Sequence, residues 1–456
     1  MPGADSLIWL IAVSVLFVLS ELVPELLKLP LGADEITYIA RTSARSSGVF
    51  LPPVHGHGVG LLAAPVTLLT TSLTALRIWM AVLSGLALFG SLLCWRGLRQ
   101  AWVLAVAGLI FGSLAITEIS GIQVYPDLWA AFGGLAVTGL LLQAVERRMR
   151  ARLVLPLIAF ATLIIVLMRP QNIVFMLAPT FAAPLVVRGW RQPRVLVAMI
   201  IGIALGVVDW VAEAYLWFGG LGHRITLAGQ EPPPFKVNFS LLMQIKTMSG
   251  PWYCQPAPYG NPTPCHPGFS HPAVYLWWLA FFALVALGLY AAWRRPAKAS
   301  SVLAVVTAGW VGLLYIVFVP FGAPRYFLPC WALLAIVAAD GIAWLVTSFE
   351  PKKAGIALAG VFLLSGIISQ HVVLGSLTAN AKATRPFLKE ADALRRDGIK
   401  PPCFIPSSPY VGYYLGCIGG WTGGTTKEVL SLTPGGTHGW RVVHVPGPVS
   451  PVWVRQ

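Results

Sequence analysis

The chain has 456 residues, of which 57% are hydrophobic and 11% are charged, and its mean hydropathy is +0.74. Soluble globular domains carry about 25% charged residues, so this composition excludes a water-soluble protein and indicates a surface that mostly faces lipid. The net charge is +15. The Lys and Arg residues stand in short clusters between apolar runs, which is typical of membrane topology signals and argues against nucleic-acid binding.

Apolar runs of about 20 residues recur along the chain and predict an all-α polytopic membrane protein with about eleven transmembrane helices. The first run follows no Lys or Arg and precedes no small-residue cleavage site, so we interpret it as a span and not as a signal peptide. The apolar segment 57–74 is a re-entrant or interfacial helix, or a twelfth span. The predicted spans are 7–24, 76–95, 101–118, 127–145, 152–168, 172–188, 195–217, 272–292, 299–319, 326–347 and 354–374.

Clusters of basic residues in the loops set the topology. With eleven spans and the N-terminus inside, all of these clusters fall on one side, which the positive-inside rule assigns to the cytoplasm. A twelfth full span would break this agreement. The clusters are Arg96 and Arg99; Arg147, Arg148, Arg150 and Arg152; Arg188, Arg191 and Arg194; Arg294, Arg295 and Lys298; and Lys352 and Lys353.

This topology predicts a transmembrane domain over 1–375, with outer loops at about 24–75 and 219–271. The second loop is rich in Pro, Gly and aromatic residues, which indicates ordered irregular backbone and not a separate domain. Residues 376–456 are expected to form a small extracytoplasmic α/β cap, with a helix over 384–396 followed by two or three short strands.

The cysteines support an outer location for this loop and tail. Cys254 and Cys265 lie in the loop, and Cys403 and Cys417 lie in the tail. On the outer side of a membrane, two local disulfides are expected. A zinc site that uses His266 beside Cys265 is an alternative, but it lacks a CxxC pair.

Acidic residues mark the outer ends of several predicted helices. Asp34 and Glu35 follow the first span, where a partly desolvated carboxylate can act as a general base; alternatively, they only favour the dipole of the following helix. Asp127 opens a later span, either as part of a site or as an N-cap. Glu213 shares one helix face with Asp209, and intramembrane acids usually face a bundle interior or a cavity.

Histidines and arginines lie at the same outer level. His55 and His57 stand in a Gly-flanked turn, where they bind phosphate or metal or are simply polar loop residues. Arg169 and Arg325 end predicted spans, where each either snorkels to lipid headgroups or clamps a phosphate. Together with Arg77 and the nearby acids, they indicate a site for an anionic lipid headgroup. Asp340, deeper in its span, is expected to bond to a neighbouring helix.

The order of these motifs resembles the GT-C membrane glycosyltransferases, in particular the branch of protein O-mannosyltransferases and lipid A aminoarabinose transferases. Those proteins share an acidic motif in the first outer loop, a Pro-Pro stretch, an ALR helix start, an acid that opens a later span, and a late RY-x-L-P motif. The resemblance covers about residues 1–350. The matching segments here are DE, SGVFLPP, HGHGVGLLAAPV, ALRIWMAVLSGL, YPDLWAAFGGLAVTGLLL, RP and RYFLPCWALLAIVAADG.

The resemblance implies an inverting glycosyltransferase of the EC 2.4 class that moves a sugar from a polyprenyl-phosphate donor to an extracytoplasmic hydroxyl. His55 and His57 stand where relatives often have Lys-Pro-Pro, so a family Lys that could meet phosphate is absent. The implied roles are catalytic for Asp34, Glu35 and Asp127; donor-phosphate binding for Arg325, Arg169, His55, His57 and Tyr326; and cavity lining for Tyr38, Glu213 and Tyr215.

The expected partners are the bilayer, the lipid-linked sugar and a glycan, glycolipid or protein acceptor, in the plasma (inner) membrane with the site facing outward. The scheme requires no metal, although a divalent metal stays open. A secondary transporter or a lipid-binding membrane protein is the alternative. Transporters usually place acids at the midplane and contain repeats, whereas these candidates cluster at one outer face and no repeat is visible.

Overall fold

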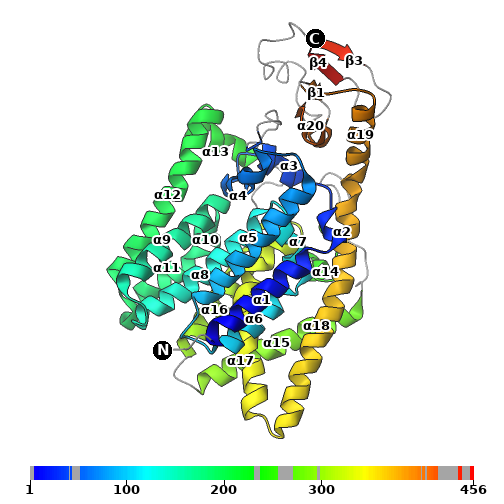
Figure 1. Ribbon diagram of the computed structural model, residues 1–456. Helices are drawn as coiled ribbons and strands as arrows, with labels where there is room; N and C mark the ends of the chain where they lie inside the picture. The colour runs from blue at the N-terminus through cyan, green and yellow to red at the C-terminus, as the bar shows by residue number, and fades with distance from the viewer. Residues whose placement is uncertain are drawn as a thin grey trace.

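The structure is a computed structural model that describes residues 5–40, 42–43, 52–230, 237–254, 271–294, 298–401, 403–405, 408–419, 440–443 and 452–455. Long helices form a bundle, and a small sheet lies beyond one end of it near the C-terminus (Figure 1). The helices α3, α4 and α13 gather at that same end, which places the residues around Asp34 under the C-terminal region.

The helices of the first half are α1 (Asp5–Glu21), α2 (Pro24–Leu27), α3 (Ala33–Ala40), α4 (Gly58–Thr67), α5 (Leu73–Leu93), α6 (Ala101–Gly112), α7 (Ala115–Ile122), α8 (Pro126–Val145), α9 (Ala151–Met168), α10 (Asn172–Phe175), α11 (Leu177–Val186), η1 (Arg188–Trp190) and α12 (Pro193–Trp217). The second half contains α13 (Leu221–Gln230), α14 (Leu241–Thr247), α15 (Pro272–Trp293), α16 (Lys298–Phe318), η2 (Pro324–Phe327), α17 (Leu328–Ser348), α18 (Lys352–Ala381), η3 (Lys382–Thr384), α19 (Arg385–Arg396) and α20 (Pro409–Leu415).

Within the described residues, eight helices are long and apolar enough to cross a membrane, or nine if α6 and α7, bent by 80°, count as one broken span. The chain is therefore a multi-pass membrane protein, but the predicted count of eleven is not confirmed. The first predicted span forms the shorter apolar helix α1, and segment 172–188 is divided into α10 and α11.

The length of its helix decides whether segment 57–74 spans the membrane. It forms α4, which has 10 residues and is therefore about 15 Å long. A bilayer core is about 30 Å thick, so α4 reaches only part of the way across. A short helix of this kind fits the re-entrant or interfacial interpretation and not a twelfth span.

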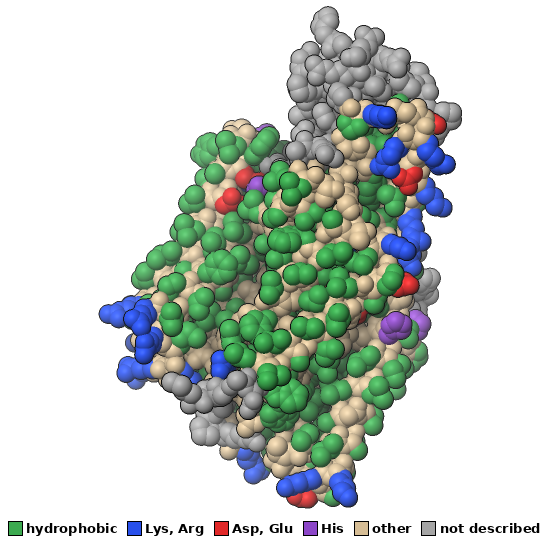
Figure 2. Space-filling model, in the orientation of Figure 1, with side chains coloured by type: hydrophobic (Ala, Val, Ile, Leu, Met, Phe, Trp, Pro, Cys, Tyr) green, Lys and Arg blue, Asp and Glu red, His purple; other side chains and the backbone are tan. Residues whose placement is uncertain are grey.

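The basic loops meet at the end of the bundle opposite the sheet. Arg148 after α8 donates to the carbonyl of Gly97 after α5, and Gln192 before α12 donates to the carbonyl of Ala144 at 3.0 Å. Figure 2 shows Lys and Arg side chains at this lower end and along α19, separated by a broad hydrophobic belt. This distribution fits a membrane-embedded middle with a basic cytoplasmic face.

Asp340 of α17 also lies toward the basic end. Arg99 Nε donates to both of its carboxylate oxygens, at 2.8 and 2.9 Å, and the Ser301 hydroxyl of α16 donates at 3.3 Å. The predicted bond between Asp340 and a neighbouring helix is therefore confirmed.

The helices α8 and α17 form the buried centre of the bundle. The backbones of α15 and α17 approach closely where two glycines face each other. A Cβ added to Gly341 would lie 2.3 Å from the Leu284 carbonyl oxygen, and one added to Gly288 would lie 1.9 Å from that of Val337. Any side chain here must push the two helices apart.

The C-terminal region continues from α18, whose 30 residues extend about 45 Å and project beyond the bilayer core. Strands β1 (Cys403–Ile405), β2 (Ile418–Gly419), β3 (Trp440–Val443) and β4 (Val452–Arg455) form a sheet in the order β2-β1-β4-β3. The described residues thus contain four strands where two or three were expected. Among them, β1 and β2 pair in parallel, and the β1–β4 and β3–β4 pairs are antiparallel.

The expected disulfide between Cys403 and Cys417 is confirmed. Cys254 is also disulfide-bonded, whereas its expected partner Cys265, and the His266 of the alternative zinc site, lie outside the described residues.

We expect Gly341→Ala to reduce the free energy of unfolding by about 1–3 kcal/mol, the usual cost of overpacking a core. Chemical unfolding in detergent measures this loss. Gly360→Ala on α18 is the matched control, because a Cβ there meets nothing within 4 Å; its helix-favouring effect of up to about 1 kcal/mol should leave stability unchanged or raised. Equal behaviour of the two variants would contradict the close α15–α17 contact.

Candidate active site

Asp34 lies at the second position of α3, at the outer end of the bundle. Its Oδ2 accepts a hydrogen bond of 2.7 Å from Arg325 Nη2. The Asp34 side chain is 32% exposed, whereas the Arg325 side chain is 4% exposed. The carboxylate is therefore fixed on one side by a buried cation and open to incoming molecules on the other.

Arg325 is held on aromatic faces. It belongs to η2, the single turn that leads into α17. Its guanidinium carbon lies 4.5 Å from the ring centre of Tyr125, 5.3 Å from that of Tyr253 and 5.5 Å from that of Tyr326. Such cation–π contacts compensate part of the desolvation of a buried arginine. Tyr125 and Tyr253 were not predicted as site residues.

Asp127 connects Arg325 to a second arginine. It lies in the first turn of α8, and its Oδ2 accepts from Arg169 Nη2 at 3.2 Å and lies 3.6 Å from Arg325 Nε. Arg169, at the end of α9, also stacks over Tyr326 at 5.1 Å. The structure therefore brings Asp34, Asp127, Arg169 and Arg325 into one continuous cluster.

Several buried donors in this cluster have no hydrogen-bond acceptor among the described residues. They are Arg325 Nη1, Arg169 Nε and the Tyr38 hydroxyl. Buried polar groups in folded proteins are nearly always paired. Unpaired donors from two arginines at one place are therefore the pattern expected where a ligand oxygen completes the site.

The electrostatics differ between Asp34 and His55. Burial raises the pKa of Asp34, but the permanent charges of Arg325 and Arg169 outweigh it, so the pKa lies below its ordinary value. Burial lowers the pKa of His55 to about 4, despite the opposing effect of Asp34. At neutral pH, Asp34 is therefore ionised and His55 is uncharged, so His55 does not supply the positive charge of a missing Lys.

His55 is placed beside the cluster by two contacts. Its ring stacks on Tyr38 with the ring centres 5.0 Å apart, and its carbonyl accepts from Arg224 Nη2 at 3.0 Å. Its Nδ1 is buried without a partner among the described residues. Burial raises the pKa of Tyr38, so the neutral Tyr38 hydroxyl can donate a hydrogen bond.

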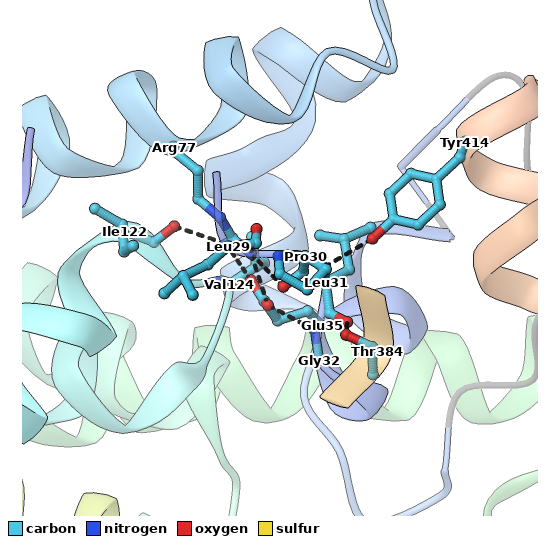
Figure 3. Close-up of polar contacts among 10 residues, drawn as sticks. All are labelled: Leu29, Pro30, Leu31, Gly32, Glu35, Arg77, Ile122, Val124, Thr384 and Tyr414. Carbon is cyan, nitrogen blue, oxygen red and sulfur yellow. Dashed lines mark hydrogen bonds and ion pairs between the residues drawn. The ribbon is translucent and has the colours of Figure 1, made fainter. Parts of the chain in front are cut away.

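Glu35, the other half of the acidic pair, is bound to Arg77 and to neighbouring backbone groups instead of to this cluster (Figure 3). Its side chain is fully buried, and Arg77 binds its two oxygens at 2.5 and 3.0 Å. The backbone amides of Val124 and Gly32 donate to the same carboxylate, each at 2.8 Å. Arg77, predicted as part of an anionic headgroup site, is therefore committed to Glu35.

A second polar cluster surrounds Glu213. Arg224 donates to it at 3.2 Å, and His57 Nδ1 lies 3.7 Å from it. Arg224 also donates to the carbonyl of Pro53 at 3.0 Å, so it fixes the loop that carries both histidines. The sequence signal for Arg224 was a basic residue in an outer loop that we interpreted as irregular.

Tyr215 lies outside both clusters. Its side chain is 67% exposed on α12, so the structure does not place it in a cavity. No group of three or more His, Cys, Asp or Glu side chains that could hold a metal ion occurs in the part of the chain that the structure describes.

The chain resembles known proteins in its structure but not in its sequence. No protein-family model and no curated protein matches the sequence. The structure is similar to ArnT from Cupriavidus metallidurans bound to undecaprenyl phosphate, with a TM-score of 0.63 and 13% identity over 94% of this chain and 87% of that chain. The oligosaccharyltransferase of Archaeoglobus fulgidus matches with a TM-score of 0.52 and 12% identity, over 91% of this chain and 65% of that chain.

Both matched proteins are GT-C membrane glycosyltransferases. The chain has the GT-C fold. Because the identities are this low, the likeness concerns the arrangement of the helices. In this chain the acid–arginine cluster joins residues from α3, α8 and η2, the turn that leads into α17.

We expect Glu35→Gln to reduce the free energy of unfolding by about 3–5 kcal/mol at neutral pH, since it leaves the buried Arg77 without its counter-charge. Asp34→Asn should cost much less, because Arg325 keeps Asp127 and its tyrosines. Unfolding of both variants in the same detergent compares the two losses. A larger loss for Asp34→Asn would contradict the division between a structural and an exposed acid.

Proposed function

We propose that the chain is an inverting glycosyltransferase that moves a sugar from a polyprenyl-phosphate donor to the hydroxyl of an extracytoplasmic acceptor. One observation carries the proposal. A partly exposed, ionised Asp34 pairs with the buried Arg325, and Asp127 links Arg325 to the buried Arg169. Both arginines retain N–H donors without acceptors among the described residues. This arrangement provides a base and an oxyanion site within one small volume.

The donor phosphate is assigned to Arg325 and Arg169. Guanidinium groups bind phosphate through paired hydrogen bonds, and Arg325 Nη1 and Arg169 Nε have the free capacity. The ring of Tyr326 lies within cation–π distance of both arginines. As the bond between the anomeric carbon and the phosphate oxygen breaks, negative charge grows on the leaving phosphate, and the two cations stabilise it.

The polyprenyl chain is assigned to an apolar groove of about 870 Å³ between α14, α15, α16 and α17. Its wall includes Phe327, Cys330 and Trp331, which follow Arg325 directly along the chain. The hydrocarbon chain of a lipid whose phosphate binds Arg325 can therefore lie in the adjacent apolar groove. Undecaprenyl phosphate in the matched ArnT structure supports a lipid of this class.

Asp34 is assigned as the general base. The acceptor hydroxyl attacks the anomeric carbon on the side opposite the phosphate, its proton passes to Asp34, and polyprenyl phosphate leaves. One displacement of this kind inverts the anomeric configuration. The ion pair with Arg325 lowers the basicity of Asp34. A bound phosphate competes for Arg325, which raises the Asp34 pKa when the donor is in place.

The other predicted site residues receive supporting roles. Asp127 orients Arg169 and Arg325, and Glu35 with Arg77 positions α3. His55 and Tyr38 line the sugar side as neutral hydrogen-bonding groups, and His57 with Glu213 borders the loop. The proposal places the chain in the plasma membrane, and its outward-facing site is supported by the basic loops, which lie at the opposite end of the bundle.

We expect Asp34→Asn to slow sugar transfer by about 10²–10⁴-fold, the usual contribution of general base catalysis. The assay follows covalent product formation from a polyprenyl-phosphate-linked sugar by purified protein. Asp397→Asn is the matched control, because Asp397 is an exposed acid directly after α19. Full transfer by Asp34→Asn would overturn the assignment, and uptake into sealed vesicles without covalent product would indicate a transporter.

A further inference from the structure

We infer that the C-terminal region is part of the catalytic apparatus, because Tyr414 and Thr384 position the backbone from which α3 begins and so hold Asp34 against Arg325. The inference rests on the proposed function, since it assigns these two residues to the alignment of the base. Neither residue touches the acid–arginine cluster, so both are positioning residues.

The backbone of the segment Leu29–Gly32 is held by hydrogen bonds from both sides. It lies directly before α3, and every one of its backbone polar atoms has a partner. The carbonyls of Leu29 and Pro30 accept from Arg77 Nη2, each at 3.2 Å. The Leu31 amide donates to the Tyr414 hydroxyl at 2.8 Å, and the Leu31 carbonyl accepts from the Thr384 hydroxyl at 2.9 Å.

The remaining groups of the segment bond locally. The Leu29 amide donates to the Leu26 carbonyl at 3.0 Å, and the Gly32 carbonyl accepts from Ile36 at 3.2 Å. The Gly32 amide donates to Glu35. Figure 3 shows the two sides of this arrangement, with Arg77 on one side of the segment and Tyr414 and Thr384 on the other. Both sides are needed, because a buried backbone group without a partner is costly.

A shift of this segment would reach the cluster by a short route. A Cβ added to Gly32 would lie 2.4 Å from the Tyr125 hydroxyl oxygen, so the backbone already touches Tyr125. The Tyr125 ring in turn supports Arg325. Asp34 itself follows two residues after Gly32. Movement of Leu31 therefore changes both members of the Asp34–Arg325 pair.

Tyr414 is itself held in place by contacts within the C-terminal region. Arg395 of α19 donates to the Tyr414 carbonyl at 2.8 Å, and Phe387 of α19 stacks on Tyr410 of α20 with ring centres 4.8 Å apart. The disulfide between Cys403 and Cys417 closes the chain around α20. Because α19 continues from α18, the Tyr414 hydroxyl is fixed relative to the membrane bundle.

Tyr414→Phe tests the inference, and Tyr413→Phe is its control. Both tyrosines are buried in α20, but the Tyr413 hydroxyl has no partner among the described residues. We expect Tyr414→Phe to lower kcat about tenfold, which corresponds to about 1.4 kcal/mol of barrier, with the donor KM unchanged. Tyr413→Phe should match the unaltered protein.

The pH profile separates misalignment from a general loss of structure. A looser Asp34–Arg325 pair raises the Asp34 pKa, so the acid limb of kcat/KM should move to higher pH in Tyr414→Phe. The other groups around Asp34 are unchanged in this variant. They are Arg169, His55, Tyr38, Tyr125, Tyr253 and Tyr410.

Thr384 provides an independent test if Tyr414→Phe fails to fold. Thr384→Val should show the same loss of kcat and the same pH shift, and Thr384→Ser, which keeps the hydroxyl, should restore both. The inference is overturned if Tyr414→Phe and Thr384→Val keep full kcat while Asp34→Asn is inactive. If Asp34→Asn is fully active instead, the proposed function itself is overturned.

Discussion

The buried pair of Glu35 and Arg77 is the interaction on which the outer end of the molecule depends. Two opposite charges with no exposed surface are stable only when nearly every lone pair and proton is used. Here the carboxylate accepts from Arg77 and from two backbone amides, and Arg77 also reaches the carbonyl of Ile122 at 2.9 Å. The pair therefore ties α3, α5 and the α7–α8 junction together.

The adjacent acids illustrate what a sequence can and cannot assign. Successive residues of a helix point about 100° apart, so one acid of the pair must turn inward when the other faces the cluster. Both acids favour the dipole at a helix start, and neither composition nor spacing says which one is buried. The assignment becomes visible only through Arg77, a residue that lies 42 positions away from Glu35.

The depth of each candidate residue in the membrane could be predicted from the sequence. Topology converts the position of a residue along a span into a height, so Asp34, Asp127, Arg169 and Arg325 could be placed at one level from the sequence. Lateral neighbours could not be deduced in this way. Tyr125 and Tyr253 contact Arg325 through packing between distant segments, and the outward direction of Tyr215 depends on the rotation of α12. The division of segment 172–188 also escaped prediction, because apolarity alone does not reveal where a helix breaks.

The apolar groove has a consequence for how the molecule exchanges its substrate. One face of α16 contributes Ala308, Gly309 and Gly312 to the groove, and these small side chains leave width for a branched hydrocarbon. Leu279 and Phe282, on the opposite wall, are 65% and 43% exposed to the surroundings of the bundle. The groove is therefore open sideways, toward the acyl chains. For the polyprenyl donor that we propose, this opening would allow entry from the leaflet and return to it by diffusion in the membrane plane, within the hydrocarbon phase.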